Sequence, residues 1–106
     1  MNEVELIQDG QRLTAQLTGE IDHHTAREMR ERIDAAVLRG QVTMLQLDFG
    51  GVTFMDSSGI GLVMGRYRLM QGLGGKVEVI RASRRMKKLM EMAGLGLLKV
   101  IRPDNE

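Results

Sequence analysis

The segment FMDSSGIGLVMGRY, Phe54 to Tyr67, places an acid, two serines and a glycine at the start of a long apolar run. Helix N-termini favour these residue types, and the apolar residues that follow recur at helical spacing. The segment therefore predicts a helix from near Ser57 to about Gln71. A serine at its start is either a helix cap or a hydroxyl that is free for chemistry. The predicted buried stripe consists of Ile60, Val63, Met64, Tyr67 and Met70.

Three strands are predicted before this segment. Alternating apolar residues mark Val4 to Gln8 and Arg12 to Thr18, and Asp9-Gly10 between them suits the tight turn of an antiparallel hairpin. Val42 to Phe49 is apolar on both sides, as expected for a central strand covered on both faces. Gly50-Gly51 is predicted to end that strand.

A helix is predicted between the hairpin and the central strand, from about Thr25 to Arg39. Thr25 and Glu28 have the spacing of a capping box, and Gly40 suits the residue just past the helix end. The apolar residues of this segment fall on one helical face, which is expected to be buried. They are Ala26, Met29, Ile33, Ala36 and Val37.

The C-terminal part alternates strand and helix again. Lys76 to Arg81 is a predicted strand, and Ser83 is expected to cap a third helix that Gly94 stops. Leu97 to Ile101 is predicted as a last short strand, followed by a polar tail from Arg102 to Glu106. The predicted buried face of the third helix is Met86, Leu89, Met90 and Ala93. Its basic run, Arg84 to Lys88, is expected to be the solvated face, and contact with an acidic partner is the less favoured alternative.

The element order is therefore ββαβαβαβ. Strand–helix–strand units need parallel crossovers, so the fold class is α/β, with a mixed and mostly parallel sheet, an N-terminal hairpin and three helices. A length of 106 residues fits one domain over residues 1–106.

Composition excludes several classes of function. The 15 basic and 14 acidic residues give a net charge of +1, which offers no footprint for nucleic acid or an anionic membrane. The chain has no cysteine, which excludes disulfides and thiolate metal sites. Neither a signal peptide nor an apolar run that spans a bilayer is recognisable. We expect a small cytoplasmic domain without a cofactor.

Two polar segments follow predicted strands and enter helices: TGEIDHHTA, Thr18 to Ala26, and FMDSSGIG, Phe54 to Gly61. Because the carboxyl ends of parallel strands meet at one edge of a sheet, these segments are expected to lie side by side there. A phosphate on a serine of the second segment would meet free backbone N–H groups at a helix start and add negative charge beside Asp56.

Other chemistry fits these residues less well. DSSGIG has Asp56 where the nucleophile elbow of a serine hydrolase has its first glycine, and His23 and His24 are the two histidines available for a triad. A metal on the same histidines, assisted by Asp22 or Glu20, lacks a known ligand spacing, because adjacent side chains diverge. No metal site is therefore expected.

The combination of GEIDHHTA with FMDSSGIGLVMGRY about thirty residues later resembles the anti-sigma-factor antagonists of the STAS domain family, most closely the sporulation members. The resemblance runs from the first hairpin to Ile101, and MKKLMEMAGL, Met86 to Leu95, also fits it. Members of this family commonly continue into a fourth C-terminal helix, whereas this sequence has Pro103 and stops at Glu106.

The resemblance implies a regulator that is not an enzyme. Its unphosphorylated form would bind an anti-sigma factor that is also a serine kinase and so release the sigma factor. The kinase would then phosphorylate Ser57, the complex would separate, and a serine phosphatase would restore the protein. The residues that the resemblance places at the partner interface are Glu20, Asp22, His23, His24, Asp56, Ser58, Gly59 and Gly61.

Two alternatives stay open on the sequence. One is an antagonist in a stress-response pathway, which belongs to the same family. The other is a receiver-like domain with an aspartyl phosphate, since Asp48 and Asp56 lie near predicted strand ends, although Lys76 begins its strand where a receiver's lysine should end one.

Overall fold

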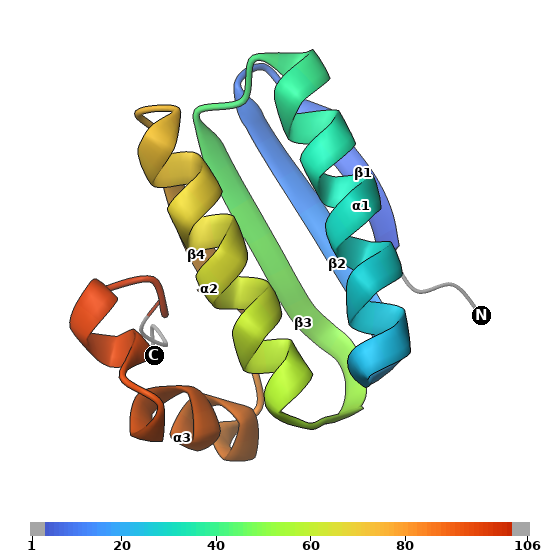
Figure 1. The fold of residues 1–106 in the computed structure, drawn as a ribbon, viewed down its shortest axis with the longest axis vertical. Coiled ribbons are helices and arrows are strands. Elements are labelled where there is room, and N and C mark those ends of the chain that lie inside the picture. Colours follow the sequence, from blue (N-terminus) through green and yellow to red (C-terminus); the bar gives the residue numbers. More distant parts are fainter. Residues whose placement is uncertain (1–3, 103–106) are drawn as a thin grey trace.

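Four strands form one sheet in the computed structural model, which describes residues 4–102 (Figure 1). Neighbouring strands in the sheet are also neighbours in the sequence, so the sheet order is β1-β2-β3-β4. The strands are β1 (Val4–Asp9), β2 (Arg12–Ile21), β3 (Met44–Met55) and β4 (Lys76–Ile80). The helices are α1 (His23–Gly40), α2 (Ser57–Gly72) and α3 (Arg84–Met92), followed by the 3-10 helix η1 (Leu95–Leu98).

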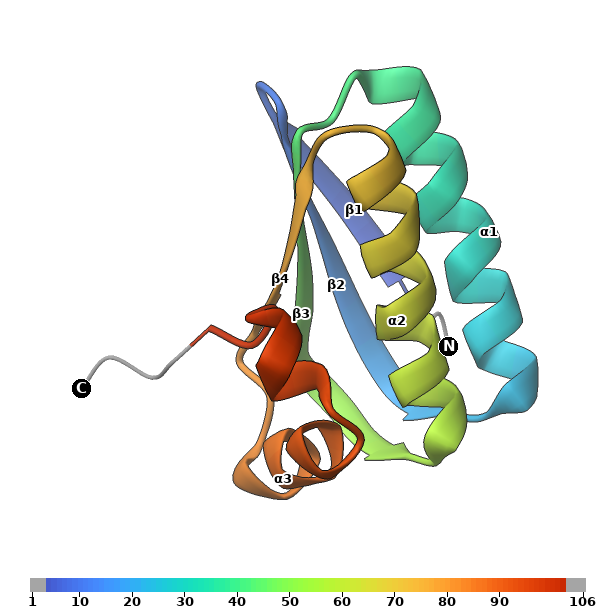
Figure 2. The same ribbon diagram turned by 60° about the vertical axis from the view of Figure 1, so that its left-hand side comes forward.

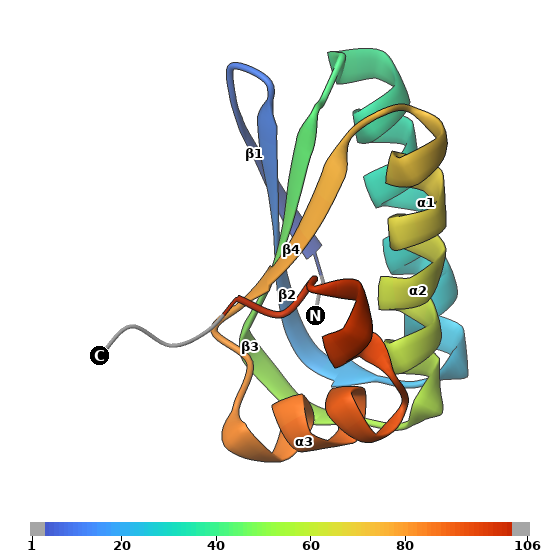
Figure 3. The ribbon, with the colours of Figure 1, turned by 90° about the vertical axis from the view of Figure 1, so that its left-hand side faces the viewer.

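The sheet is mixed, and two helices cover one of its faces. β1 and β2 form an antiparallel hairpin whose turn residue Gly10 has a φ of 63°, a value that glycine adopts without strain. β2, β3 and β4 run parallel. α1 and α2 lie side by side on the same face, whereas α3 lies at the end of the sheet where β3 runs into α2 (Figures 2 and 3). The predicted α/β fold class is confirmed.

Residues that stand opposite one another on the three parallel strands are equally spaced in the sequence. Thr14, Gln46 and Glu78 stand opposite one another on β2, β3 and β4, and each lies 32 positions after the one before it. Their side chains form a polar ladder: the Thr14 hydroxyl donates to Gln46 at 3.1 Å, and the Gln46 amide donates to Glu78 at 2.9 Å. This satisfies the buried amide of Gln46.

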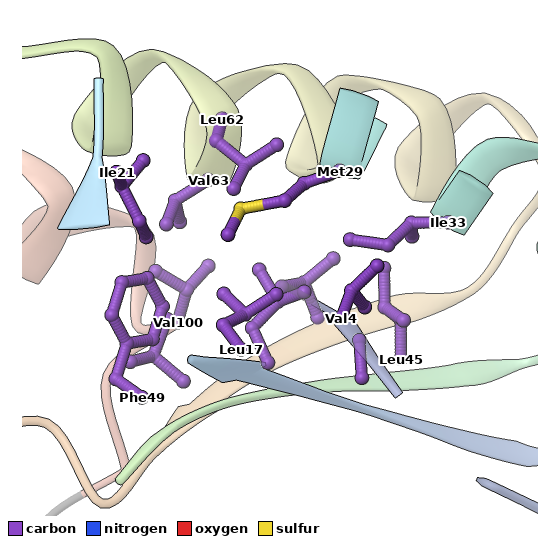
Figure 4. Packing of buried hydrophobic residues seen from close by; sticks show 14 of the residues in the cluster. Val4, Leu17, Ile21, Met29, Ile33, Leu45, Phe49, Leu62, Val63 and Val100 are labelled. Carbon is purple, nitrogen blue, oxygen red and sulfur yellow. The ribbon is translucent and has the colours of Figure 1, made fainter. Parts of the chain in front are cut away.

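The hydrophobic core fills the space between the sheet and the two long helices. Figure 4 shows side chains from both layers meeting there. Fully burying one such side chain stabilises the fold by about 1.5–3 kcal/mol. From the helices come Met29, Ile33, Leu62 and Val63, and from the sheet Leu17, Leu45 and Phe49, all at most 3% exposed.

The first helix begins and ends differently from the prediction. Asp22, and not a residue near Thr25, is its N-cap, and the capping box joins Asp22 to Thr25 instead of Thr25 to Glu28. Gly40 is the last helical residue, and Gln41 takes the left-handed conformation expected of Gly40, with a φ of 56°.

Two strands are longer than predicted. β2 continues past Thr18 to Ile21, and β3 runs through Gly50-Gly51 to Met55. Both extensions pair with each other across irregular register, which a sequence pattern of alternating residues does not reveal. In α2, Leu62 and Arg66 are buried together with Val63 and Met70, while the predicted stripe residues Ile60, Met64 and Tyr67 are half-buried.

The C-terminal part also departs from the prediction. Ser83 caps α3 as expected, but the predicted core residues Leu89 and Ala93 are exposed, and Met86 and Met90 carry the buried face. The last predicted strand is the 3-10 helix η1 followed by a single parallel bridge between Ile101 and Val79. Residues 103–106 of the predicted polar tail lie outside the described residues.

Candidate functional site

Asp56, and neither serine, caps α2. Its backbone is extended, with a φ of −102°, and its carboxylate accepts a hydrogen bond from the Ser58 amide at 2.7 Å. The Gly59 amide donates to the Asp56 carbonyl at 3.0 Å and closes the first turn. Ser57 is exposed and Ser58 half-buried. Because Asp56 satisfies the helix start, the Ser57 hydroxyl is not needed for capping.

The loop before α1 is built on the same plan. The Asp22 carboxylate accepts from the Thr25 amide at 2.9 Å, and the Asp22 amide donates to the Thr25 hydroxyl at 2.9 Å. The Thr25 hydroxyl in turn donates to the Glu20 carbonyl at 2.9 Å. The hydrogen bond from the Thr25 amide lowers the pKa of the Asp22 carboxyl below its ordinary value. The carboxylate is therefore fixed in its charged form at the helix start.

The two loops lie side by side, as the sequence predicts. Ile21 stands opposite Met55 in the parallel pair of β2 and β3. The Asp56 amide donates to the Ile21 carbonyl at 3.2 Å, so a backbone hydrogen bond joins the start of one loop to the other. Glu20, in the last residues of β2, is opposite Phe54. The acidic side chains of both loops thus share one edge of the sheet.

An open groove of about 600 Å³ runs between the N-terminal halves of α1 and α2. His23 and Ser58 stand at its loop end, and Arg27, Arg30 and Arg66 give it positive charge. The site therefore combines an acidic edge with a basic groove beside it.

Two glycines of α2 have different surroundings. A Cβ at Gly59 would stand 2.6 Å from the Met55 sulfur and 3.1 Å from the Met55 Cβ, so the helix start packs directly on the end of β3. A Cβ at Gly61 would meet nothing within 4 Å, and Gly61 lines the groove. Gly59 thus allows the helix to pack closely against Met55, whereas Gly61 leaves space in the groove that a side chain would fill.

The floor of the groove contains a buried charge pair that the sequence did not reveal. The Arg66 side chain is 7% exposed, and its Nη2 donates to Asp34 Oδ2 at 3.2 Å. Nε lies 2.8 Å from Asp34 Oδ1 but off the hydrogen-bond direction, so charge attraction holds these two atoms together. Burial raises the pKa of the Asp34 carboxyl, and the charge of Arg66 opposes that rise.

The histidines do not form a catalytic or metal-binding arrangement with the serines. His24 points along α1 and its Nε2 lies 3.4 Å from Glu28 Oε2, whereas His23 lines the groove. Within residues 4–102, no hydrogen bond joins either histidine to Ser57 or Ser58, and no group of three or more His, Asp or Glu side chains could share a metal ion. Neither serine is therefore paired with a histidine base, the arrangement that activates the nucleophile of a serine hydrolase.

Asp48 is one of the two acids that a receiver-like domain could phosphorylate. It is 4% exposed, and its carboxylate is already hydrogen-bonded. Arg81 donates to both of its oxygens, from Nε at 3.0 Å and from Nη2 at 3.1 Å, and the Gly50 amide donates to it at 2.9 Å. The guanidinium lies over Gly50, where a Cβ would be 2.6 Å from it. A carboxylate held in this way is not presented to a phosphate donor.

In the described part of the chain, no helix has the length and apolar character needed to cross a membrane.

Comparison with known proteins agrees with the resemblance drawn from the sequence. Residues 4–101 match the family described as Mlab, STAS domain. An anti-sigma F factor antagonist of Lysinibacillus sphaericus is 41% identical over 80 residues, which are 76% of this chain and 68% of that protein.

Solved structures give the same result. The anti-sigma factor antagonist SpoIIAA in its unphosphorylated form matches with a TM-score of 0.83 and 32% identity, over 97% of this chain and 89% of that one. The Bacillus cell fate determinant SpoIIAA in its phosphorylated form matches with a TM-score of 0.77 and 33% identity, over 97% and 92%. The fold, the matched residues and these relatives agree, and the chain belongs to the STAS domain family.

Proposed function

We propose that this chain is a cytoplasmic anti-sigma factor antagonist whose binding is switched off by phosphorylation of Ser57. Unphosphorylated, it binds an anti-sigma factor that is also a serine kinase, and the bound sigma factor is released. Phosphorylation separates the complex, and a serine phosphatase restores the active form. The chain itself is a regulator and a kinase substrate, not an enzyme.

The observation that carries this proposal is the accessibility of Ser57. The residue is exposed in the first turn of α2, and Asp56 caps the helix in its place. Within residues 4–102 the Ser57 hydroxyl has no hydrogen-bond partner, so it can enter a kinase active site without breaking the fold. Ser58 is half-buried beside the groove, which favours Ser57 as the acceptor.

The neighbouring loop supplies the rest of the binding surface. Glu20, Asp22, His23 and His24 share the sheet edge with Asp56, and the hydrogen bond between Asp56 and Ile21 holds the two loops at a fixed spacing. The proposal is supported by SpoIIAA, a protein of this fold with solved structures in an unphosphorylated and a phosphorylated form.

Release follows from charge and desolvation. A phosphate at Ser57 adds about −1.5 to −2 units of charge next to the Asp56 carboxylate. The positive end of the α2 dipole offsets part of the repulsion in the free protein, by about 0.3–1 kcal/mol. In a complex the same charge would be removed from water against a surface matched to a hydroxyl, which typically costs about 2–5 kcal/mol. The free phosphoprotein therefore keeps its fold, whereas its complex with the anti-sigma factor is destabilised.

Intact-mass measurement tests the proposal. The chain is incubated with ATP and the purified anti-sigma F factor of the same organism, and the phosphate is located by peptide sequencing. We expect one phosphate, on Ser57, and none on a Ser57→Ala variant. Phosphate mainly on Ser58 or Thr53 would overturn the assignment. Incubation with acetyl phosphate serves as the control for an aspartyl phosphate.

A further inference from the structure

The groove between α1 and α2 is lined on its α2 side by two glycines, Gly61 and Gly65. The two residues are four apart, so they stand on one face of the helix. A Cβ built at either position would meet nothing within 4 Å, and neither residue has a positive φ. Glycine is a poor residue for a helix interior, and here neither close packing nor backbone conformation requires it. Room for an occupant of the groove, close to the helix backbone, accounts for both glycines.

The groove also carries positive charge that the fold leaves partly unpaired. Arg27 and Arg30 line it from α1 and Arg66 lines it from α2, and none of the lining residues that the structure describes is acidic. Arg66 is paired with Asp34, and Arg27 lies 3.7 Å from the exposed Glu31. Within residues 4–102, Arg30 forms no ion pair. Burial lowers the pKa of the Arg66 guanidinium, and the like charge of Arg30 adds to this effect, against the opposing charge of Asp34. An anionic group in the groove would reduce the repulsion between the arginines.

The groove and the neighbouring acidic edge suit different partner surfaces. Glu20, Asp22 and Asp56 give the edge negative charge, so a surface that covers the edge should be basic. A basic surface would be repelled by Arg27 and Arg30, whereas a segment with carboxylates would be attracted to them. Because the anti-sigma factor of the proposed function covers the edge, the groove is better suited to another protein.

The serine phosphatase of the proposed function is the partner that fits the groove. It must reach the phosphate on Ser57, and the groove begins at Ser58, the next residue. Phosphatases commonly hold two metal ions, and carboxylates are common ligands of such hard cations. Carboxylates near a phosphatase active site would therefore meet the arginines of the groove when the phosphoserine is bound. The N-terminal ends of α1 and α2 lie at the same end of the sheet, so the groove opens beside Ser57 (Figure 1).

We propose that the groove between α1 and α2 is the docking site for an acidic segment of the serine phosphatase that restores the protein. Carboxylates of the segment pair with Arg27 and Arg30, and its backbone lies against Gly61 and Gly65. This inference rests on the proposed function. It divides the surface around Ser57 between two partners: the acidic edge binds the anti-sigma factor, and the groove binds the phosphatase.

Removal of two charges tests the groove. Arg27→Gln/Arg30→Gln is compared with Arg32→Gln/Arg39→Gln, which removes the same charge from exposed residues of α1 that do not line the groove. Glutamine forms helices about as well as arginine, so neither variant endangers the fold. Each protein is phosphorylated on Ser57 with ATP and the purified anti-sigma F factor of the same organism. Release of inorganic phosphate is then measured with a serine phosphatase that is purified from that organism by its activity on the parent phosphoprotein, and with alkaline phosphatase.

We expect the groove variant to raise the KM of the serine phosphatase about tenfold and to leave kcat within about twofold, because docking contacts act on binding and not on the chemical step. The control variant should have the KM of the parent. The difference should shrink between about 0.05 and 0.5 M salt, because exposed charges are screened. Alkaline phosphatase, which has no need of the groove, should act on all the phosphoproteins at one rate.

A second pair of variants tests the glycines. Gly65→Ala fills part of the groove and should raise the KM of the serine phosphatase severalfold. Gly72→Ala makes the same change at the last residue of α2, where a Cβ also meets nothing within 4 Å, and should leave KM unchanged. A Gly65→Ala phosphoprotein with the KM of the parent would overturn the contact with the helix backbone.

The outcomes separate the two proposals. If no phosphate forms on Ser57 of the parent, or if no phosphatase of the organism removes it, the proposed function fails and this inference fails with it. If the groove variant is dephosphorylated like the parent, or if the control variant is slowed as much, only the groove assignment is overturned. The same conclusion follows if alkaline phosphatase is slowed too, because the phosphate itself would then be less accessible. Loss of affinity for the anti-sigma factor in calorimetric titration of the groove variant would assign the groove to that interface and also overturn the proposal.

Discussion

The two glycines of the first turns of α2 allow one substitution to be tested in two surroundings. Gly59→Ala and Gly61→Ala add the same methyl group to the same helix, two residues apart. Neither glycine has a positive φ, so alanine fits the backbone at both positions. What differs is the space: a Cβ at Gly59 would lie 2.6 Å from the Met55 sulfur, and one at Gly61 meets nothing within 4 Å.

The expected effects have opposite signs. At Gly61 the gain in helix propensity, about 0.8–1 kcal/mol, is not opposed by any contact. At Gly59 the same gain is opposed by overpacking, which costs about 1–3 kcal/mol. The sulfur of Met55 can rotate away, but its Cβ, 3.1 Å from the added atom, moves only with the strand. We therefore expect Gly59→Ala to be less stable than the parent protein by about 1 kcal/mol.

Thermal and urea unfolding, followed by circular dichroism, measure both variants. At about 4 °C per kcal/mol, Gly61→Ala should raise Tm by 3–4 °C and Gly59→Ala should lower it by about 4 °C. Equal stabilisation of the two variants would refute the reasoning, since the Met55 side chain would then move aside without lowering the stability. In Met55→Ala the sulfur is absent. Adding Gly59→Ala to that variant should therefore lower Tm by less than Gly59→Ala lowers it in the parent protein.

Three further predictions concern the charged groups. Ser57→Ala should bind the anti-sigma factor and hold it, whereas Ser57→Asp should bind more than about tenfold more weakly because its carboxylate would be buried unpaired; equal affinities in calorimetric titration would place Ser57 outside the interface. Asp34→Ala should lower the free energy of unfolding by about 2 kcal/mol, less than for a fully buried pair because the carboxylate is 29% exposed; Asp34→Ala/Arg66→Met should recover part of the loss in urea unfolding, and no recovery would contradict the role of the pair. Asp22→Ala should lower the free energy of unfolding at neutral pH, because the N-cap hydrogen bond to the Thr25 amide is lost. Because the pKa of Asp22 is lowered in the folded protein, its stabilisation is present above the ordinary value of about 3.9 and is lost as the pH falls through the lowered one; a difference from the parent that does not shrink as the pH falls below the ordinary value would contradict this account.

Local signals in the sequence were enough for most of the architecture. Asp9-Gly10 marked the hairpin turn, Ser83 marked the start of α3, and the change of period marked both long helices. Each of these features depends on residues within one or two turns of each other. The expectation that two polar loops meet at one sheet edge also held, because it follows from the parallel connection alone.

The features that the sequence missed depend on distant residues. The N-cap of α1 is Asp22 because β2 continues to Ile21 in pairing with the end of β3. Arg66 looks like a surface residue in the helical pattern, and its burial requires Asp34 on the other helix. The stretch from Leu97 to Ile101 has strand composition, but Lys99 turns with a φ of 58° and a single bridge to Val79 remains.

The 32-residue spacing between Thr14, Gln46 and Glu78 constrains the order in which the sheet assembles. The hairpin of β1 and β2 closes across a tight turn, whereas each parallel pairing closes a loop of 32 residues, at an entropy cost of about 3 kcal/mol. α1 and α2 lie within those loops, so forming them first shortens the distance that the chain must close. The equal loop lengths give the two parallel pairings similar closure costs, so we expect the hairpin to form before either of them.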